Sequence, residues 1–326
     1  MCMKKYIIVI SGATATGKSD FAIKLAKQVG GEIVNADIGS WYKPLTIGTA
    51  KPDWRTESVP HHMFDILDQP QQFNVIRFRN MVQKVAQEIW SRGHVPIVVG
   101  GSAFYIKSLW YHNDDLFTFK DDEQKVEQEL SGSDRLTQDL WGQLQQIDPA
   151  RAARIYNNDR YRIVRALSIY KVTGQLASKY EPVFDPIAPM VGIVCVRDRQ
   201  ELYHRIDERV VIMLQSGWIK EVEALLDTPW EQFLLEKKII GYDDIVRYLK
   251  SDRSIEAYGQ LVSLIQQKTR NYAKRQVTFL KKLKNDVDTS LQQTQPVEFI
   301  EEMNLTLCDV GLYINGLSNR LLQIFG

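Results

Sequence analysis

Residues 12–19 read GATATGKS, and two glycines at this spacing before a lysine and a serine suit the binding of a diphosphate or triphosphate. The loop follows the apolar run YIIVI and opens a predicted helix, which is the context in which such a loop binds phosphate. Backbone N–H groups of the loop and the positive end of the helix would hold phosphate oxygens. The Lys18 ammonium would neutralise charge, and the Ser19 hydroxyl is a potential ligand of Mg²⁺. The loop predicts a bound phosphate group without identifying the molecule that carries it.

An acidic residue ends a second predicted strand. Residues 32–37 read EIVNAD, and the strand-end position would direct the Asp37 carboxylate into the cleft beside the phosphate loop. Kinases and nucleotide hydrolases usually place a Mg²⁺-binding Asp at the end of an apolar strand. Here the apolar strand at residues 95–101 ends in two glycines followed by Ser102. Asp37 is therefore a candidate general base beside a diphosphate leaving group, with a turn or capping role as the alternative.

The elements that would position these residues alternate between short apolar strands and amphipathic helices. This alternation predicts a parallel sheet with helices on both faces and ligands at the carboxyl ends of the strands. The expected elements are a strand at residues 6–10, a helix at 17–29, a strand at 32–37, a helix at 74–92 and a strand at 95–101. We expect an α/β fold: a P-loop NTPase-like parallel sheet flanked by helices, with a helical insertion domain.

The pattern changes to charged helices between residues 113 and 189, for example in DDEQKVEQEL and RYRIVRALSIYKVTG. The apolar run at residues 190–197 predicts a strand that returns the chain to the sheet, and helices follow to about residue 284. The polar segment 285–296 predicts a linker to a short strand and a last helix. We expect a discontinuous catalytic core of residues 1–112 and 190–326, and a helical insertion domain of residues 113–189.

The composition is that of a soluble globular protein, with 44% hydrophobic and 25% charged residues in a chain of 326 and a net charge of +1. No apolar run approaches the roughly 20 residues that cross a bilayer, and the first residues do not form a signal peptide, so we expect a cytoplasmic protein without membrane contact. Cys2, Cys195 and Cys308 are odd in number and far apart, which favours buried thiols over a disulfide framework.

Longer segments resemble a known family. From residue 12 to about residue 280 the chain is similar to tRNA dimethylallyltransferases of the bacterial type, also called tRNA isopentenyltransferases. The matching segments are GATATGKS, NADIGSWYKPLTIGTAKP, VPHHMFDILD, FRNMVQKVAQEIWSRGHVPIVVGGSAFYIKSL, IDPARAARIYNNDRYRIVRALSIYKVTG, LYHRIDERVVIMLQSGWIKEV, IIGYDDIVRYL and TRNYAKRQVTF. IGTAKP, VPHH and TRNYAKRQ are far more specific than the phosphate loop.

The resemblance implies a reaction and its catalytic residues. The family transfers a dimethylallyl group from dimethylallyl diphosphate to N6 of the adenosine immediately 3′ of the tRNA anticodon, releasing diphosphate with Mg²⁺ assistance. By this resemblance Asp37 accepts the proton of the adenine amine, and Lys18, Ser102 and Arg209 complete the catalytic set. Arg205 lies one turn before Arg209 and is a second candidate for the diphosphate.

The resemblance also implies the residues that bind each substrate. Diphosphate would be bound by Gly12, Ala13, Thr14, Ala15, Thr16, Gly17, Lys18, Ser19 and Arg209, with Ser19 as the metal ligand. The tRNA anticodon stem-loop would be bound by Asp37, Ile38, Gly39, Ser40, Ser102, Tyr161, Arg162, Arg165, Lys238, Gly241, Tyr242, Arg270, Lys274 and Arg275. The target adenine would flip out of the anticodon arm towards Asp37.

Two sets of residues remain open between a role in tRNA binding and a structural role. The first is a predicted basic helix stripe, whose affinity for phosphates would depend on salt and whose alternative is a solvated cationic face; it contains Arg270, Lys274, Arg275, Lys281 and Lys282. The second is aromatic, with base stacking and core packing as equal alternatives; it contains Trp41, Tyr42 and Phe104.

The chain departs from the family pattern at several positions. Ile38 and Ser40 stand where the family usually has Ser and Gln, at positions that help to recognise anticodon-loop bases. Ser102 replaces the usual Thr and keeps the hydroxyl. Asp243 and Asp244 stand where a basic residue is common, which would weaken phosphate contact there. A Cys/His zinc finger of the kind seen in eukaryotic members is absent from the sequence, and a packing or turn role is expected for the adjacent histidines at 61 and 62.

Three other functions share parts of this pattern. An adenylate isopentenyltransferase would need neither the insertion nor the basic helix. A small-molecule or nucleoside kinase would share the phosphate loop and the sheet but would bind ATP. A catalytically inactive tRNA-binding homologue would follow if the altered DIGSWY segment had abolished catalysis. A monomeric enzyme with tRNA, dimethylallyl diphosphate and Mg²⁺ as its partners is the expectation that accounts for all the segments.

Overall fold

The structure is a computed structural model that describes residues 5–112, 125–126, 129–130, 136–294 and 299–326. The chain divides into two compact units, one of residues 1–110 and 186–326 and the other of residues 111–185. Cys2 and most of the charged helix expected at residues 121–130 lie outside the described residues.

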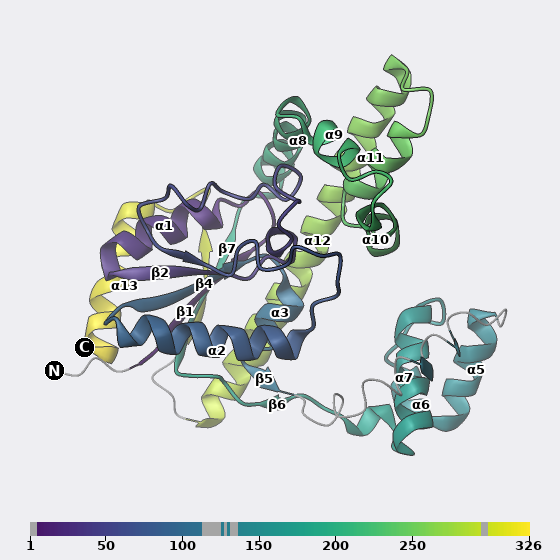
Figure 1. Cartoon of the computed structure of the whole chain (residues 1–326). Helices are drawn as coiled ribbons and strands as arrows, with labels where there is room; N and C mark the ends of the chain where they lie inside the picture. Colours follow the sequence, from purple (N-terminus) through teal and green to yellow (C-terminus); the bar gives the residue numbers. More distant parts are fainter. Residues whose placement is uncertain (1–4, 113–124, 127–128, 131–135, 295–298) are drawn as a thin grey trace. The chain divides into compact units, whose positions relative to one another are not determined.

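A six-stranded parallel sheet forms the centre of the first unit (Figure 1), which confirms the predicted α/β fold class. Its strand order is β3-β2-β4-β1-β7-β8. The strands are β1 (Ile7–Gly12), β2 (Gly31–Asn35), β3 (His61–His62), β4 (Val95–Gly100), β7 (Met190–Val196) and β8 (Phe299–Asn304). Every residue of β1, β2 and β4 is buried, as expected for parallel strands covered on both faces.

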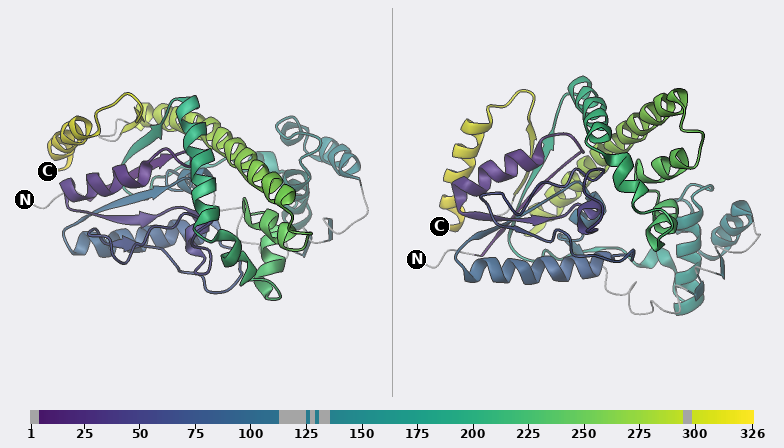
Figure 2. Two further views of the ribbon diagram at one scale, coloured as in Figure 1. Left: turned by 90° about the horizontal axis from the view of Figure 1, so that it is seen from above. Right: turned by 45° about the horizontal axis from the view of Figure 1, so that its top comes forward.

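Helices cover both faces of this sheet. On one face, α1 (Lys18–Val29) and α13 (Val310–Phe325) pack over alternate strand residues such as Ile8 and Ile10. The opposite face is covered by α2 (Val75–Ser91), α3 (Ala103–Lys107) and part of α12 (Ile255–Thr294) (Figure 2). Packing on both faces holds the sheet in place, and the sheet in turn positions the loops at its carboxyl edge.

A group of helices extends the first unit beyond the sheet. It consists of α8 (Arg199–Gln215), α9 (Trp218–Glu223), α10 (Pro229–Lys237), α11 (Tyr242–Leu249) and the remainder of α12. Helix α12 contacts β1 and β8 along one stretch and α8 and α11 along another. The prediction of a linker at residues 285–296 is wrong up to Thr294, because α12 continues to that residue. Leu283, Val287 and Leu291 give this part of α12 a buried face.

The second unit is a separate small helical domain. Its described elements are β5 (Tyr111–His112), α5 (Thr137–Ile147), α6 (Pro149–Ala152), α7 (Arg160–Thr173), the 3₁₀ helix Ala177–Lys179 and β6 (Val183–Phe184). Strands β5 and β6 pair antiparallel, and α5 and α7 share an apolar core that includes Leu140, Leu144 and Ile163. Across the part of the chain that the structure describes, no helix is long and apolar enough to span a membrane.

Candidate active site

The phosphate loop lies between β1 and α1, and two arginines hold its backbone, Arg197 just after β7 and Arg205 on α8. The Arg205 Nε–H donates to the Ala15 carbonyl at 2.9 Å, and the Arg197 Nε–H donates to the Thr16 carbonyl at 2.6 Å. Gly17 has φ of +94°, a left-handed conformation that L side chains rarely adopt. The two guanidinium groups thus hold the loop through its carbonyl oxygens. Its glycine allows the chain to enter α1 with N–H groups turned towards the cleft.

A second clamp on the loop comes from α12. The Gln276 side chain is buried; its Oε1 accepts from the Thr14 N–H at 2.9 Å, and its Nε2–H donates to the Gly101 carbonyl at 2.7 Å. Gln276 therefore joins the loop after β1 to the loop after β4. The sequence analysis did not select this residue, although it is the last residue of the TRNYAKRQ segment.

Asp37 lies two residues beyond β2, so the strand predicted to end at Asp37 ends at Asn35 instead. The Asn35 side chain fixes the turn, because its Oδ1 accepts from the Asp37 N–H at 2.9 Å and its Nδ2–H donates to the Asp37 carbonyl at 3.2 Å. The next residue, Ile38, donates its N–H to the Ser102 hydroxyl at 3.2 Å. The backbone on both sides of the Asp37 carboxylate is held in place.

Asp37 interacts electrostatically with two cations. Burial lowers the pKa of the Lys18 ammonium, the Asp37 carboxylate opposes this effect, and the Arg209 guanidinium adds to it. Burial likewise lowers the pKa of Arg209, again against the effect of Asp37. The three cations Lys18, Arg205 and Arg209 outnumber the two carboxylates Asp20 and Asp37 here, and the resulting net positive charge favours a polyanionic ligand.

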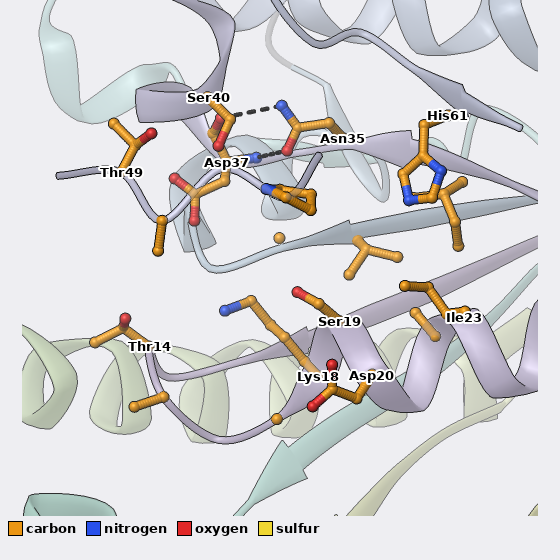
Figure 3. Close-up of a pocket in the computed structure, with 18 of the residues that line it drawn as sticks. Thr14, Lys18, Ser19, Asp20, Ile23, Asn35, Asp37, Ser40, Thr49 and His61 are labelled. Carbon is orange, nitrogen blue, oxygen red and sulfur yellow. Dashed lines mark hydrogen bonds between the residues drawn. The ribbon is translucent and has the colours of Figure 1, made fainter. Parts of the chain in front are cut away.

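Two cavities meet at these residues. Their volumes are about 290 Å³ and about 470 Å³, and both are lined by Thr14, Asp37, Thr49 and Arg209. In the smaller cavity, Asp37 and Thr49 lie on one side and face Lys18 and Thr14 on the other (Figure 3). Asp37 is therefore accessible from both cavities at their junction.

The two linings differ in chemistry. The smaller cavity joins the phosphate loop to apolar residues of α1, β2 and β4, namely Ala22, Ile23, Ile33 and Val99. The larger cavity has apolar and aromatic walls with basic residues beside them; these residues are Ile206, Val210, Met213, Trp218, Ile239, Ile240 and Tyr272, with Lys237, Lys238 and Arg275. The first suits a phosphorylated molecule with a short apolar group, and the second suits a planar base attached to phosphates.

Oxygen donors surround the start of α1. Ser19 is exposed and lines the smaller cavity with Asp20, Asn35 and Asp37. Among the described residues, no group of three or more His, Cys, Asp or Glu side chains could hold a metal ion. This donor set fits Mg²⁺, which binds oxygen, retains water ligands and is commonly bound through substrate phosphates rather than by a protein cage.

Comparisons with known proteins identify the family. The IPP transferase model matches residues 40–283, and an isopentenyl transferase model matches residues 3–59. The chain belongs to the IPP transferase family. It is 35% identical over 283 residues to a tRNA dimethylallyltransferase of Acetivibrio thermocellus, covering 86% of this chain and 90% of that protein. It is 40% identical over 285 residues to tRNA dimethylallyltransferase 1 of Citrifermentans bemidjiense, again covering 86% and 90%.

A solved structure of the family shares the fold. It is a tRNA isopentenylpyrophosphate transferase of Staphylococcus epidermidis, with 30% sequence identity and a TM-score of 0.63 over 98% of this chain and 100% of that chain. The family is thus one of prenyltransferases, and its P-loop NTPase-like fold agrees with the fold described above.

For an IPP transferase, the residues expected to act on substrate fall into groups by position. One group lines the cavities, consisting of Thr14, Ala15, Gly17, Lys18, Ser19, Asp37, Ile38, Gly39, Ser40, Ser102, Arg209, Lys238 and Arg275. A second group, Ala13 and Thr16, makes a contact inside the phosphate loop: the Thr16 hydroxyl donates to the Ala13 carbonyl at 2.8 Å. Lys274 is exposed on α12, and Arg270 pairs with Asp207.

Two residues of this family member that were expected to contact tRNA have structural contacts. Tyr242 is fully buried and donates its hydroxyl hydrogen to Glu221 at 2.7 Å, so its side chain packs inside the first unit. Gly241 packs under the Trp218 ring, where an added Cβ would lie 2.1 Å from the ring. Both were selected from motif position, which does not distinguish a residue that faces tRNA from one that supports the motif.

The other open residues separate by burial. Asp243 and Asp244, which stand where a basic residue is common in the family, are buried and pair with Lys268 and Arg247. Trp41 is buried against Phe73, Phe78 and Tyr105, and Tyr42 against Trp230 and Phe233, so core packing accounts for both, although Tyr42 also lines the larger cavity. Phe104 is 61% exposed. In the second unit, Tyr161 and Arg162 of α7 are exposed.

Proposed function

We propose that this protein transfers a dimethylallyl group from dimethylallyl diphosphate to N6 of the adenosine immediately 3′ of the anticodon in tRNA. The observation that carries the proposal is the junction of the two cavities, where the phosphate loop, Asp37 and Arg209 meet. A donor in the smaller cavity and an acceptor base in the larger one would face each other there. Such an enzyme would act in the cytoplasm as a monomer.

The phosphate loop and two cations would stabilise the leaving group. As the bond between the allylic carbon and oxygen breaks, negative charge develops on the diphosphate. Loop N–H groups, the Lys18 ammonium and the Arg209 guanidinium would bind it, as the main electrostatic contribution to catalysis; that these groups line the smaller cavity together supports this role. Mg²⁺ bound near Ser19 would neutralise further charge on the diphosphate.

Asp37 would serve as the general base. The N6 nitrogen forms its bond to the allylic carbon and must lose one proton, which the Asp37 carboxylate accepts. The fixed turn around Asp37 and its place at the cavity junction support this role, since a base must lie within about 3 Å of the nitrogen whose proton it takes.

The larger cavity would receive the flipped adenine. Its apolar walls and Tyr272 provide surfaces for a base, and Lys237, Lys238 and Arg275 provide charge for neighbouring phosphates. Exposed basic residues of α12 would add sequence-independent contacts to the backbone; they are Lys274, Lys281 and Lys282. In the second unit, Tyr161, Arg162 and Arg165 of α7 are proposed to contact the same tRNA.

An assay with donor labelled in the dimethylallyl group tests the proposal. With Mg²⁺ present, we expect label on bulk bacterial tRNA and none on AMP or on tRNA without Mg²⁺. Label on AMP alone would instead favour an adenylate isopentenyltransferase. Absence of label on both, together with thermal protection by ATP rather than by the donor, would favour a kinase.

A further inference from the structure

A carboxylate outside the catalytic set holds one loop of the active site. The backbone N–H groups of Thr46 and Ile47 donate to Glu221 Oε2 at 2.9 and 2.7 Å, and the N–H of Gly48 donates to Oε1 at 3.3 Å. Glu221 belongs to α9, whereas residues 46–48 follow the turn that carries Asp37. One charged side chain therefore satisfies three successive backbone donors of a loop more than 170 residues away in sequence.

Tyr242 fixes the same carboxylate from α11. Its hydroxyl donates to Glu221 Oε1 at 2.7 Å, and its buried ring packs edge-on against Trp218 with 5.4 Å between ring centroids. Burial and the Glu221 charge raise the pKa of the Tyr242 hydroxyl well above its usual value. The hydroxyl therefore stays protonated and remains a donor, and Glu221 cannot turn away from the loop without losing it.

Packing joins the loop to α9 as well. An added Cβ on Gly48 would lie 2.0 Å from Trp218 Nε1, and one on Gly241 would lie 2.1 Å from the same ring. The indole is thus held between the loop and the start of α11. Trp218 is also a wall of the larger cavity, so the contact that holds the loop is part of the cavity itself.

Thr49 connects the loop to the turn that carries Asp37. An added Cβ on Gly39 would lie 2.8 Å from Thr49 Cγ2, which shows how closely Thr49 packs on the turn that begins with Asp37. Thr49 also lines both cavities beside Asp37. Glu221 thus contacts the backbone of residues 46–48, and the next residue, Thr49, lines the junction of the two cavities.

We propose that Glu221 is a positioning residue for the transfer step: it holds residues 46–49 as the wall that sets the place of the acceptor nitrogen relative to Asp37. This inference rests on the proposed function. It differs from a role in folding because it predicts an effect on turnover rather than on the amount of folded protein or on tRNA affinity.

Variants of Glu221 and Tyr242, with one control, test the inference. In Glu221→Gln, an amide N–H₂ replaces an oxygen that accepts from backbone N–H groups, so the loop loses at least one contact and gains a repulsive one. Tyr242→Phe keeps the ring and removes the hydroxyl, which bonds to Glu221 and also interacts with the Gly48 backbone and the Trp218 side chain. The matched control is Glu223→Gln on the same helix, whose carboxylate is 48% exposed and pairs with Arg253.

The measurement is kcat and KM for a tRNA anticodon stem-loop, below the unfolding temperature of every variant. We expect Glu221→Gln to lower kcat about 100-fold, as a small misplacement of reacting groups does, with KM for tRNA changed less than about threefold. Tyr242→Phe should lower kcat less, Glu221→Asp should recover part of the loss, and the Glu223→Gln control should match the wild type.

Two results would overturn the inference. One is wild-type kcat in Glu221→Gln and Tyr242→Phe. The other is a loss that follows the fraction of folded protein, or that appears in KM for tRNA alone. If Glu221→Gln fails to fold, Tyr242→Phe decides by the same criteria. Absence of transfer by the wild type would instead contradict the proposed function, so the two failures are distinguishable.

Discussion

At the scale of single residues, Arg209 is the cation that sequence position alone would leave ambiguous. It stands on α8 among other charged residues, a setting that is common for exposed surface arginines. In the structure it lines both cavities, and its pKa is lowered by burial against the effect of Asp37. A guanidinium can make a two-point contact with a phosphate group, and this is the contact that the proposed function assigns to Arg209.

Replacing Arg209 by Lys should lower kcat/KM for the donor about 100-fold, the usual effect of removing one donor to a developing negative charge. A lysine keeps the charge but cannot reproduce paired N–H donors. Steady-state kinetics with varied dimethylallyl diphosphate measure the effect. Arg199→Lys, an exposed change on the same helix, is the control, and equal kinetics in the two variants would refute the role.

The sequence predicts that Lys18, Ser19 and Asp37 lie together at one cleft, and all three line the smaller cavity. The motif makes this possible, because the phosphate loop fixes Lys18 and Ser19 at the start of a helix and Asp37 follows a neighbouring strand. Gln276 and Glu221 could not be found in this way, because each acts on the backbone of a segment more than 170 residues away. Only the folded chain brings those partners together.

At the scale of elements, Gln276 joins α12 to the loops after β1 and β4. Gln276→Leu would leave the Thr14 N–H and the Gly101 carbonyl without this partner, and we expect unfolding free energy to fall by about 2 kcal/mol. Donor protection against thermal unfolding should fall as well, because the phosphate loop is less ordered. Denaturant unfolding compares the stability of Gln276→Leu with that of the control Gln267→Leu, an exposed change on the same helix. Equal stability of the two would contradict this account.

Hydrogen bonds of a second buried side chain, Glu32, connect β2 and β3 to the turn after α2. Glu32 is buried and bonds to His62, Arg92 and His94, and these bonds lower its pKa to about 2 despite the opposing effect of burial. Because the folded pKa is below the ordinary value of 4.5, this stabilisation is complete above about pH 4.5 and is lost as pH falls towards 2.

Glu32→Gln should therefore lower unfolding free energy at pH 7 by about 2 kcal/mol and flatten its decline between pH 4.5 and 2. Denaturant titrations across this range measure both effects. Glu88→Gln, an exposed change on α2, should keep the wild-type profile. A Glu32→Gln profile parallel to that of the wild type would show that Glu32 is not the titrating group.

At the scale of elements the sequence also failed in an instructive way. Residues 285–294 are polar and were expected to form a linker, but Leu283, Val287 and Leu291 give one buried face to a continuing helix. A narrow apolar stripe on a long helix is easily missed beside many polar residues. The predicted strands were found more reliably, because a strand buried on both faces is continuously apolar.

At the scale of the whole molecule, the chain combines a unit built on the parallel sheet with a small helical unit. If α7 of the helical unit contacts tRNA, the double variant Arg162→Ala/Arg165→Ala should weaken tRNA binding and reduce its salt dependence by about one unit of slope per arginine. Donor binding should be unchanged. Binding at several salt concentrations measures this, with Arg154→Ala, an exposed arginine of the same unit, as the control. An unchanged salt slope would remove these arginines from the interface.

The most direct test of the central claim is the mass and position of the modified nucleoside in tRNA incubated with the donor and Mg²⁺. With the wild type we expect one dimethylallyl group on the adenosine immediately 3′ of the anticodon. With Asp37→Asn, a loss of about 100-fold or more is expected at retained donor binding. Modification at another nucleoside, or equal modification by Asp37→Asn, would contradict the account.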